Sequence, residues 1–125
     1  MKKLTFTDRM RGFQYALNGL LITWKEEPNM ILHLLGSLLA ILAAWYFDLT
    51  LTEWNLILFS IGLVWTAETF NTAIENLCDA VTLEHNEHIG KAKDVSAAAV
   101  LVASITAATI GIIVFGPKVW DWIAA

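Results

Sequence analysis

Three carboxylates and an amide recur at helical spacing in the middle of the chain: Glu68, Asn71, Glu75 and Asp79. Neither proline nor glycine occurs in residues 63–79, so a single helix is expected there. At about 100° per residue, the four side chains fall on one stripe roughly 80° wide. The residues just before them, 56–67, form an apolar run. Acidic residues in a helix apolar enough to span a membrane are rare, and they indicate a functional site.

Carboxylates in this arrangement could hold a divalent cation, and one of them could accept a proton. Mg²⁺ takes hard oxygen ligands, often one or two carboxylates together with substrate phosphates. A carboxylate near an apolar boundary also suits a general base. In the other interpretation the acids lie beyond the membrane edge on a solvated face. That interpretation suits Glu75 and Asp79 better than Glu68, which directly follows the apolar run.

The elements that carry the stripe are predicted to be membrane helices of a single domain. The chain has 125 residues, of which 57% are hydrophobic and only 16% charged, and six tryptophans are available as interfacial anchors. The predicted fold class is therefore an all-α membrane protein. We expect an amphipathic surface helix within residues 1–29, followed by transmembrane helices at 30–47, 54–81 and 95–115.

Several residues predict where these helices begin and end. Thr7 or Asp8 is expected to cap the first helix. Pro28 should end it, because proline breaks a helix and disfavours helical geometry in the residue before it. Gly90 is expected to break the chain before the third span, and residues 116–117, Gly-Pro, to stop that span.

Other residues are interpreted as packing material. Cys78 is expected to be a small buried apolar residue, and His33 to form a hydrogen bond or reach the interface rather than bind a metal. A stripe of small residues on the third span predicts close helix packing: Ala99, Ala103, Ala107 and Gly111.

Lysine and arginine set the expected orientation. They are concentrated before residue 26 and at residues 91–93, whereas residues 48–53 have none. The N-terminus and the loop between the second and third spans should therefore face the cytoplasm, and the C-terminus the outside. This orientation places Glu27, Lys93 and the C-terminal part of the stripe of Glu68, Asn71, Glu75 and Asp79 (the acid stripe) together at the cytoplasmic surface.

Acids, an amide and a lysine at that surface suggest nucleotide chemistry, because phosphoryl transfer depends on positioning and charge neutralisation. The chain has no Gly-rich phosphate loop and none of the soluble-kinase motifs. Acids within a helix bundle also serve transport, so a small transporter or proton-coupled channel stays open on composition alone. The sequence pI near 5.2 and the lack of a long basic run argue against a nucleic-acid partner.

Residues 68–79, E-T-F-N-T-A-I-E-N-L-C-D, resemble the signature of the bacterial integral-membrane diacylglycerol kinase/undecaprenol kinase family, roughly E-x-x-N-S/T-S/A-I/V-E-x-x-x-D. The similarity continues through residues 91–101 and, upstream, through 15–19 and 24–29, so it covers nearly the whole chain. The resemblance implies a homotrimeric bundle of three-span protomers in the bacterial inner membrane. It also implies that MgATP is used to phosphorylate a lipid alcohol at the cytoplasmic face.

The resemblance further implies roles for individual residues. Glu68 is expected to be the general base and, together with Ala97, to contact the lipid substrate. Asn71 is expected to orient the base or a phosphate oxygen. Glu27 and Glu75 are expected to hold Mg²⁺ on the ATP phosphates. A structural membrane subunit with a degenerate kinase site is a third interpretation, which the full set of matching residues argues against.

The residues implied to bind ATP are Tyr15, Glu27, Glu75, Glu84, Lys93 and Asp94. Lys93 would neutralise phosphate charge. Two features depart from the family pattern. The histidine that the family has after the position of Glu84 is shifted in this sequence, and Asp8 disturbs the alignment of Arg9 and Arg11 with the family's N-terminal basic residue. Residues 29–33, 52–54 and 61–64 resemble the undecaprenol branch of the family more than the diacylglycerol branch, so undecaprenol is the favoured acceptor.

Overall fold

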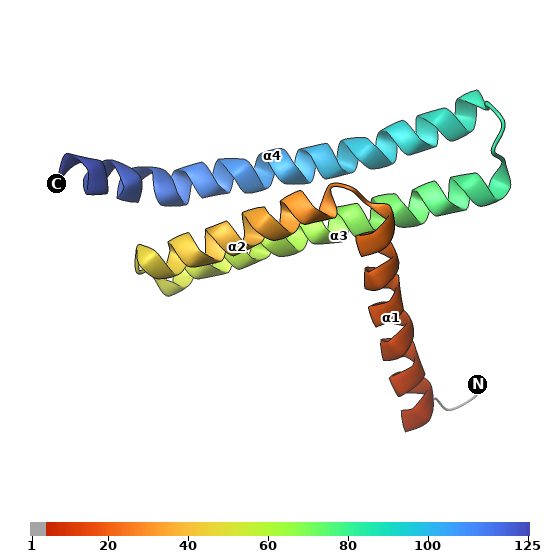
Figure 1. Ribbon diagram of the computed structural model, residues 1–125, viewed down its shortest axis with the longest axis horizontal. Helices are drawn as coiled ribbons and strands as arrows, with labels where there is room; N and C mark the ends of the chain where they lie inside the picture. The colour runs from red at the N-terminus through yellow and green to blue at the C-terminus, as the bar shows by residue number, and fades with distance from the viewer. Residues whose placement is uncertain (1–4) are drawn as a thin grey trace.

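The computed structural model describes residues 5–125. Figure 1 shows that they fold into four α-helices: α1 (Phe6–Glu26), α2 (Met30–Tyr46), α3 (Leu51–Val81) and α4 (Glu87–Ala124). The described chain contains no strand, so the predicted all-α class is confirmed.

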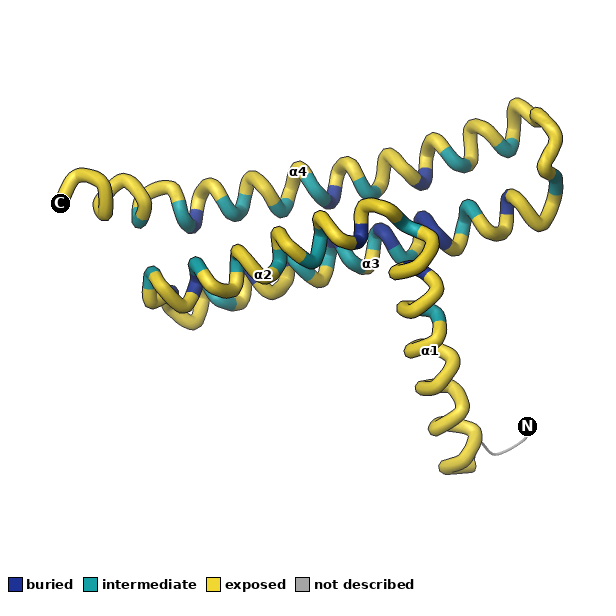
Figure 2. The backbone as a smooth tube through the Cα atoms, in the orientation of Figure 1, coloured by how far each residue is buried: buried dark blue, intermediate teal, exposed yellow. Residues whose placement is uncertain are grey.

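Three of the helices lie side by side, and the first leaves them at a steep angle (Figure 1). The axes of α1 and α2 are bent by 107° at the short break between them. Pro28 lies in that break, as the sequence predicts. The buried residues gather where α3 faces α2 and α4, whereas most of the helical surface is exposed (Figure 2).

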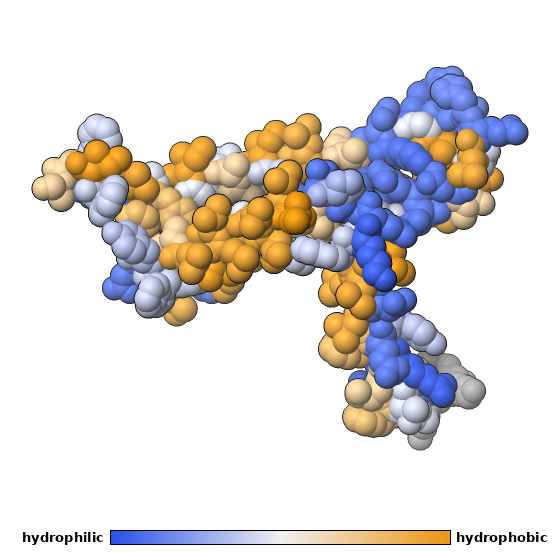
Figure 3. Space-filling model, viewed as in Figure 1, coloured by the Kyte–Doolittle hydropathy of each residue, from blue (hydrophilic) through white to orange (hydrophobic). Residues whose placement is uncertain are grey.

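Two helices, α3 and α4, are each long and apolar enough to cross a membrane. With 17 residues, α2 is short for a span, and it passes the same test only together with α1 as a bent pair. At about 1.5 Å per residue α4 is roughly 57 Å long, well beyond the ~30 Å of a hydrocarbon layer. Apolar residues cover the shared bundle, and polar residues gather around the α3–α4 connection and the α1–α2 corner (Figure 3).

The predicted cap of the first helix is wrong by a few residues. Thr5 is the N-cap of α1, where its hydroxyl accepts from the Asp8 backbone N–H at 3.3 Å. The Asp8 carboxylate accepts in return from the Thr5 N–H at 2.9 Å. Thr50 and Glu53 form the same reciprocal capping box at the start of α3, so α3 begins at Leu51 rather than at residue 54.

The predicted helix breaks at Gly90 and Pro117 are also wrong. α4 begins after Asn86, whose side chain caps the N–H groups of His88 and Ile89. The helix then continues through both Gly90 and Pro117. A single glycine costs a helix only about 1 kcal/mol. Proline removes one backbone hydrogen bond, but the rest of the helix ladder stays intact and α4 continues to Ala124. Beyond Pro117, Lys118 forms a 3.1 Å ion pair with Glu53 that ties α4 to the start of α3.

Packing of α4 against α3 follows the small-residue stripe in part. Ala103 is buried and Ala107 half-buried, but Ala99 is exposed.

Cys78 is buried on α3, which confirms its predicted packing role. Asp48, in the turn between α2 and α3, has φ of 49°, a left-handed conformation that aspartate tolerates better than most residues.

Candidate active site

The corner between α1 and α2 brings two acids against α3. Thr72 donates its hydroxyl proton to Glu27 Oε1 at 3.1 Å, in competition with the Glu68 carbonyl oxygen at 2.9 Å. Asn76 Nδ2 donates to Glu26 Oε2 at 2.6 Å. These bonds join residues 45 and 50 positions apart, so they fix the corner to the half of α3 that carries the acid stripe.

An acidic cleft of about 250 Å³ opens at this corner. Its lining consists of Glu26, Glu27, Thr72, Glu75, Asn76 and Asp79. Four of these side chains are carboxylates, and none is cationic. In the described chain no group of three or more histidine, cysteine or acidic residues is close enough to hold a metal alone. Two carboxylates combined with phosphates are nevertheless a usual ligand set for Mg²⁺, so the donors fit that ion.

A chain of hydrogen bonds fixes the amide of Asn71. Ser96 on α4 donates to Asn71 Oδ1 at 2.7 Å, in competition with the Lys93 carbonyl oxygen at 2.8 Å. Asn71 Nδ2 donates to Glu75 Oε1 at 3.2 Å. Because the Glu75 carboxylate can only accept, the amide nitrogen must face it, and Oδ1 is left to accept from Ser96. Ser96 and Asn71 are both buried. The sequence prediction missed Ser96, a small uncharged residue whose role arises from the packing of α4 on α3.

We predict that Ser96→Ala destabilises this link. The substitution leaves the buried Asn71 carbonyl oxygen without its donor, which should cost about 1–3 kcal/mol of unfolding free energy. Denaturant unfolding in detergent micelles would measure the change. Thr106→Val on the same helix is the control, because the Thr106 hydroxyl is exposed and bonds only its own helix. Equal losses in the two variants would contradict the prediction.

Lys93 lies close to the acid stripe but does not line the cleft. Its Nζ forms a 2.5 Å ion pair with Asp79 Oδ1 at the end of α3. Both side chains are more than a third exposed, so the pair contributes little to stability. Lys93 is therefore held only weakly by Asp79.

Glu68 is separated from the cleft and buried, with 1% of its surface exposed. It lies one helical turn before Thr72, toward the apolar half of α3. Its partner at ion-pair distance is His33 of α2, whose Nε2 is 3.8 Å from Glu68 Oε1. His33 was not among the predicted site residues, because no sequence spacing indicates a contact between residues 35 positions apart.

Four other residues of the predicted site do not meet the cleft within one chain. Tyr15 is exposed on α1, roughly 18 Å along the helix from Glu27 at 1.5 Å per residue. Glu84 is exposed in the α3–α4 connection, and Asp94 and Ala97 are exposed on α4. Their roles stay predictions.

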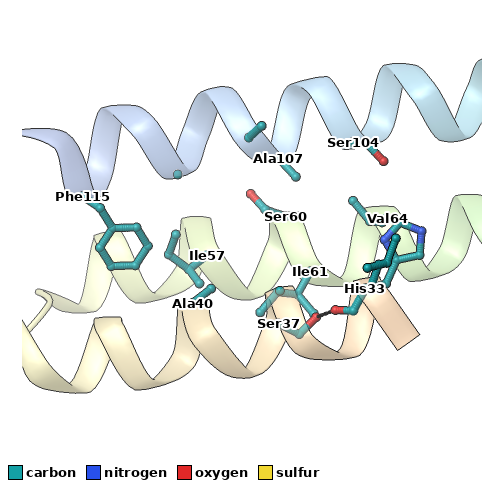
Figure 4. A pocket seen from close by; sticks show the side chains of 14 residues that line it. His33, Ser37, Ala40, Ile57, Ser60, Ile61, Val64, Ser104, Ala107 and Phe115 are labelled. Atoms are coloured by element: carbon teal, nitrogen blue, oxygen red, sulfur yellow. Dashed lines mark hydrogen bonds between the residues drawn. The ribbon is translucent and has the colours of Figure 1, made fainter. Parts of the chain in front are cut away.

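An apolar crevice of about 280 Å³ runs between α2, α3 and α4 (Figure 4). His33 lies toward one end and Phe115 toward the other. Most of the lining is aliphatic, with hydroxyls from Ser37, Ser60 and Ser104. The end marked by His33 is the end nearest Glu68.

These features define an all-helical membrane protein with an acidic cleft at one end of its bundle. The model of the family described as prokaryotic diacylglycerol kinase matches residues 14–115. The undecaprenol kinase of Bacillus subtilis (strain 168) is 32% identical over 108 residues, covering 86% of this chain and 88% of that protein. The diacylglycerol kinase of Escherichia coli (strain K12) is 34% identical over 102 residues, covering 82% and 84%. The chain therefore belongs to the prokaryotic diacylglycerol kinase family.

Proposed function

We propose that this chain transfers the γ-phosphate of ATP to the hydroxyl of a membrane lipid alcohol, with undecaprenol favoured over diacylglycerol. Its family makes it a membrane lipid kinase. The observation that carries the proposal is the placement of a buried carboxylate, Glu68, between an acidic cleft and the end of an apolar crevice. The phosphates of a nucleotide, together with a bound cation, suit the cleft, and a lipid chain suits the crevice.

Glu68 acts as the general base in this proposal. It takes the proton of the lipid hydroxyl as that oxygen forms a bond to the γ-phosphorus, and the bond from the γ-phosphorus to the bridging oxygen of ADP breaks. Asn71, held between Ser96 and Glu75, orients a phosphate oxygen or the base. Lys93 leaves Asp79 to neutralise phosphate charge.

Glu27 and Glu75 would hold Mg²⁺ against the ATP phosphates, and the ion would neutralise the charge that develops during transfer. Glu27 is kept in place by Thr72, and Glu75 by Asn71. Tyr15, Glu84 and Asp94 complete the nucleotide site in this proposal, and Ala97 contacts the lipid.

We further propose a homotrimer in the bacterial inner membrane, with the N-terminus in the cytoplasm and the C-terminus outside. Association would account for the position of Tyr15, Glu84 and Asp94, which lie away from the cleft of their own chain. Neighbouring protomers would then supply the residues that one chain leaves away from the cleft. The mass of the detergent-solubilised protein, corrected for bound detergent, measures the number of chains.

The test of function offers undecaprenol and diacylglycerol side by side, in mixed micelles, to purified protein with ATP and Mg²⁺. We expect phosphate transfer from labelled ATP to lipid, faster with undecaprenol. Faster transfer to diacylglycerol would reverse the acceptor preference. No transfer to either lipid by folded protein would overturn the proposal. Solute counterflow in liposomes without ATP use would then favour a transporter.

A further inference from the structure

We propose that His33 is a positioning residue, which holds the Glu68 carboxylate in place through its imidazole Nε2. The inference rests on the function proposed above. It concerns a contact between α2 and α3 that lies outside the acidic cleft.

The imidazole nitrogen is buried without a hydrogen-bond partner. Nε2 of His33 is the one such side-chain atom in the described chain. A buried polar group left without a partner costs about 1–3 kcal/mol. Glu68 Oε1, at 3.8 Å, is within ion-pair distance but beyond a hydrogen bond. A shift of about 1 Å by the two side chains would make the bond.

Within the described chain, His33 is the basic side chain at ion-pair distance from Glu68. Glu27 is bonded to Thr72, and Glu75 is bonded to Asn71. Within the described chain, Glu68 forms no ion pair other than the one with His33. The side chain of Asn29, just before α2, also lies within hydrogen-bonding reach of Glu68. Among the described residues, the imidazole is therefore the basic group available to orient this carboxylate.

The backbone that carries His33 is fixed to α3 close to Glu68. Ser37 donates to the His33 carbonyl oxygen at 2.6 Å, a bond drawn in Figure 4. Trp65 Nε1, three residues before Glu68, donates to Ser37 Oγ at 3.1 Å. This link sets the register of α2 against α3 beside the two side chains. Glu68 thus receives a support of fixed geometry, which a catalytic group needs for an efficient reaction.

The test compares two substitutions of similar size. His33→Met removes the donor, and His33→Gln keeps a side-chain N–H near the position of Nε2. We expect His33→Met to lower kcat for lipid phosphorylation about 10- to 100-fold, as a 1 Å misplacement of a reacting group can. The KM for ATP should change less than about 2-fold, because the cleft is untouched. His33→Gln should recover most of the rate, to within about 5-fold of the unmodified protein.

Thr109→Val is the control, since its exposed hydroxyl bonds only the Ile105 carbonyl of its own helix. A folded His33→Gln protein that loses as much activity as His33→Met would overturn the proposal, and so would an unchanged kcat in His33→Met. If His33→Met does not fold, a His33→Gln rate within the stated range supports the proposal and a lower rate overturns it. Lipid phosphorylation by the unmodified protein is measured in parallel, so failure of the proposed function is distinguishable from failure of this inference.

Discussion

Replacement of Glu68 by glutamine should lower kcat for lipid phosphorylation by about 10³-fold while MgATP still binds. Glutamine has nearly the same shape as glutamate but cannot accept the proton of the lipid hydroxyl at neutral pH. Glu68 is buried and does not line the acidic cleft, so the nucleotide site should keep its geometry. Single-turnover phosphorylation measures the first effect, and equilibrium binding of ATP measures the second.

The matched control is Glu87→Gln, because the Glu87 side chain is exposed and pairs only with Lys91 of the same helix. It should keep the full rate. Substantial phosphorylation by Glu68→Gln would remove Glu68 as the base. Loss of ATP binding together with the rate would instead show that Glu68 supports the nucleotide site.

The second large effect is expected at Glu75. Glu75→Gln should raise the Mg²⁺ concentration for half-maximal activity about 10-fold or more, because it removes one of the two carboxylates proposed to hold the ion. The amide oxygen of glutamine can still accept from Asn71, so the local fold should survive. A Mg²⁺ titration at saturating ATP measures the shift.

Glu26→Gln separates a ligand effect from a general loss of negative charge. Glu26 lines the same cleft, but its carboxylate is exposed and engaged by Asn76. We expect its Mg²⁺ midpoint to move less than about 3-fold, as for a charge screened by solvent. Equal shifts in both variants would argue that the cleft attracts the ion only through its summed charge. An unchanged midpoint in Glu75→Gln would count against its role as a ligand.

The acid stripe was predictable because it depends on one helix. Glu68, Asn71 and Glu75 are all in α3, as their spacing requires. Burial along that stripe was not predictable. Glu68 is enclosed and Glu75 is half-exposed in the cleft, since the neighbouring helices cover only part of α3. Helical periodicity gives the face of a residue but not what packs on it.

Partners contributed by other helices could not be found from spacing. Ser96 and His33 reach Asn71 and Glu68 from α4 and α2. Neither contact leaves a periodic signal, and both depend on how the helices are set against one another. Local rules also gave the wrong ends for α4. Gly90 and Pro117 were expected to break the helix, but α4 continues through both, because glycine costs a helix only about 1 kcal/mol and proline removes a single backbone hydrogen bond.

The corner between α1 and α2 has a mechanical consequence. α1 is an arm of roughly 32 Å, 21 residues at 1.5 Å each, joined to the bundle at one end. Glu27 is its C-cap and lies at the pivot, where Thr72 ties it to α3. A tilt of about 10° would move the far end of the arm by roughly 5 Å and Glu27 by less than about 1 Å. A tilt of the arm would therefore leave the cleft acid nearly in register with α3.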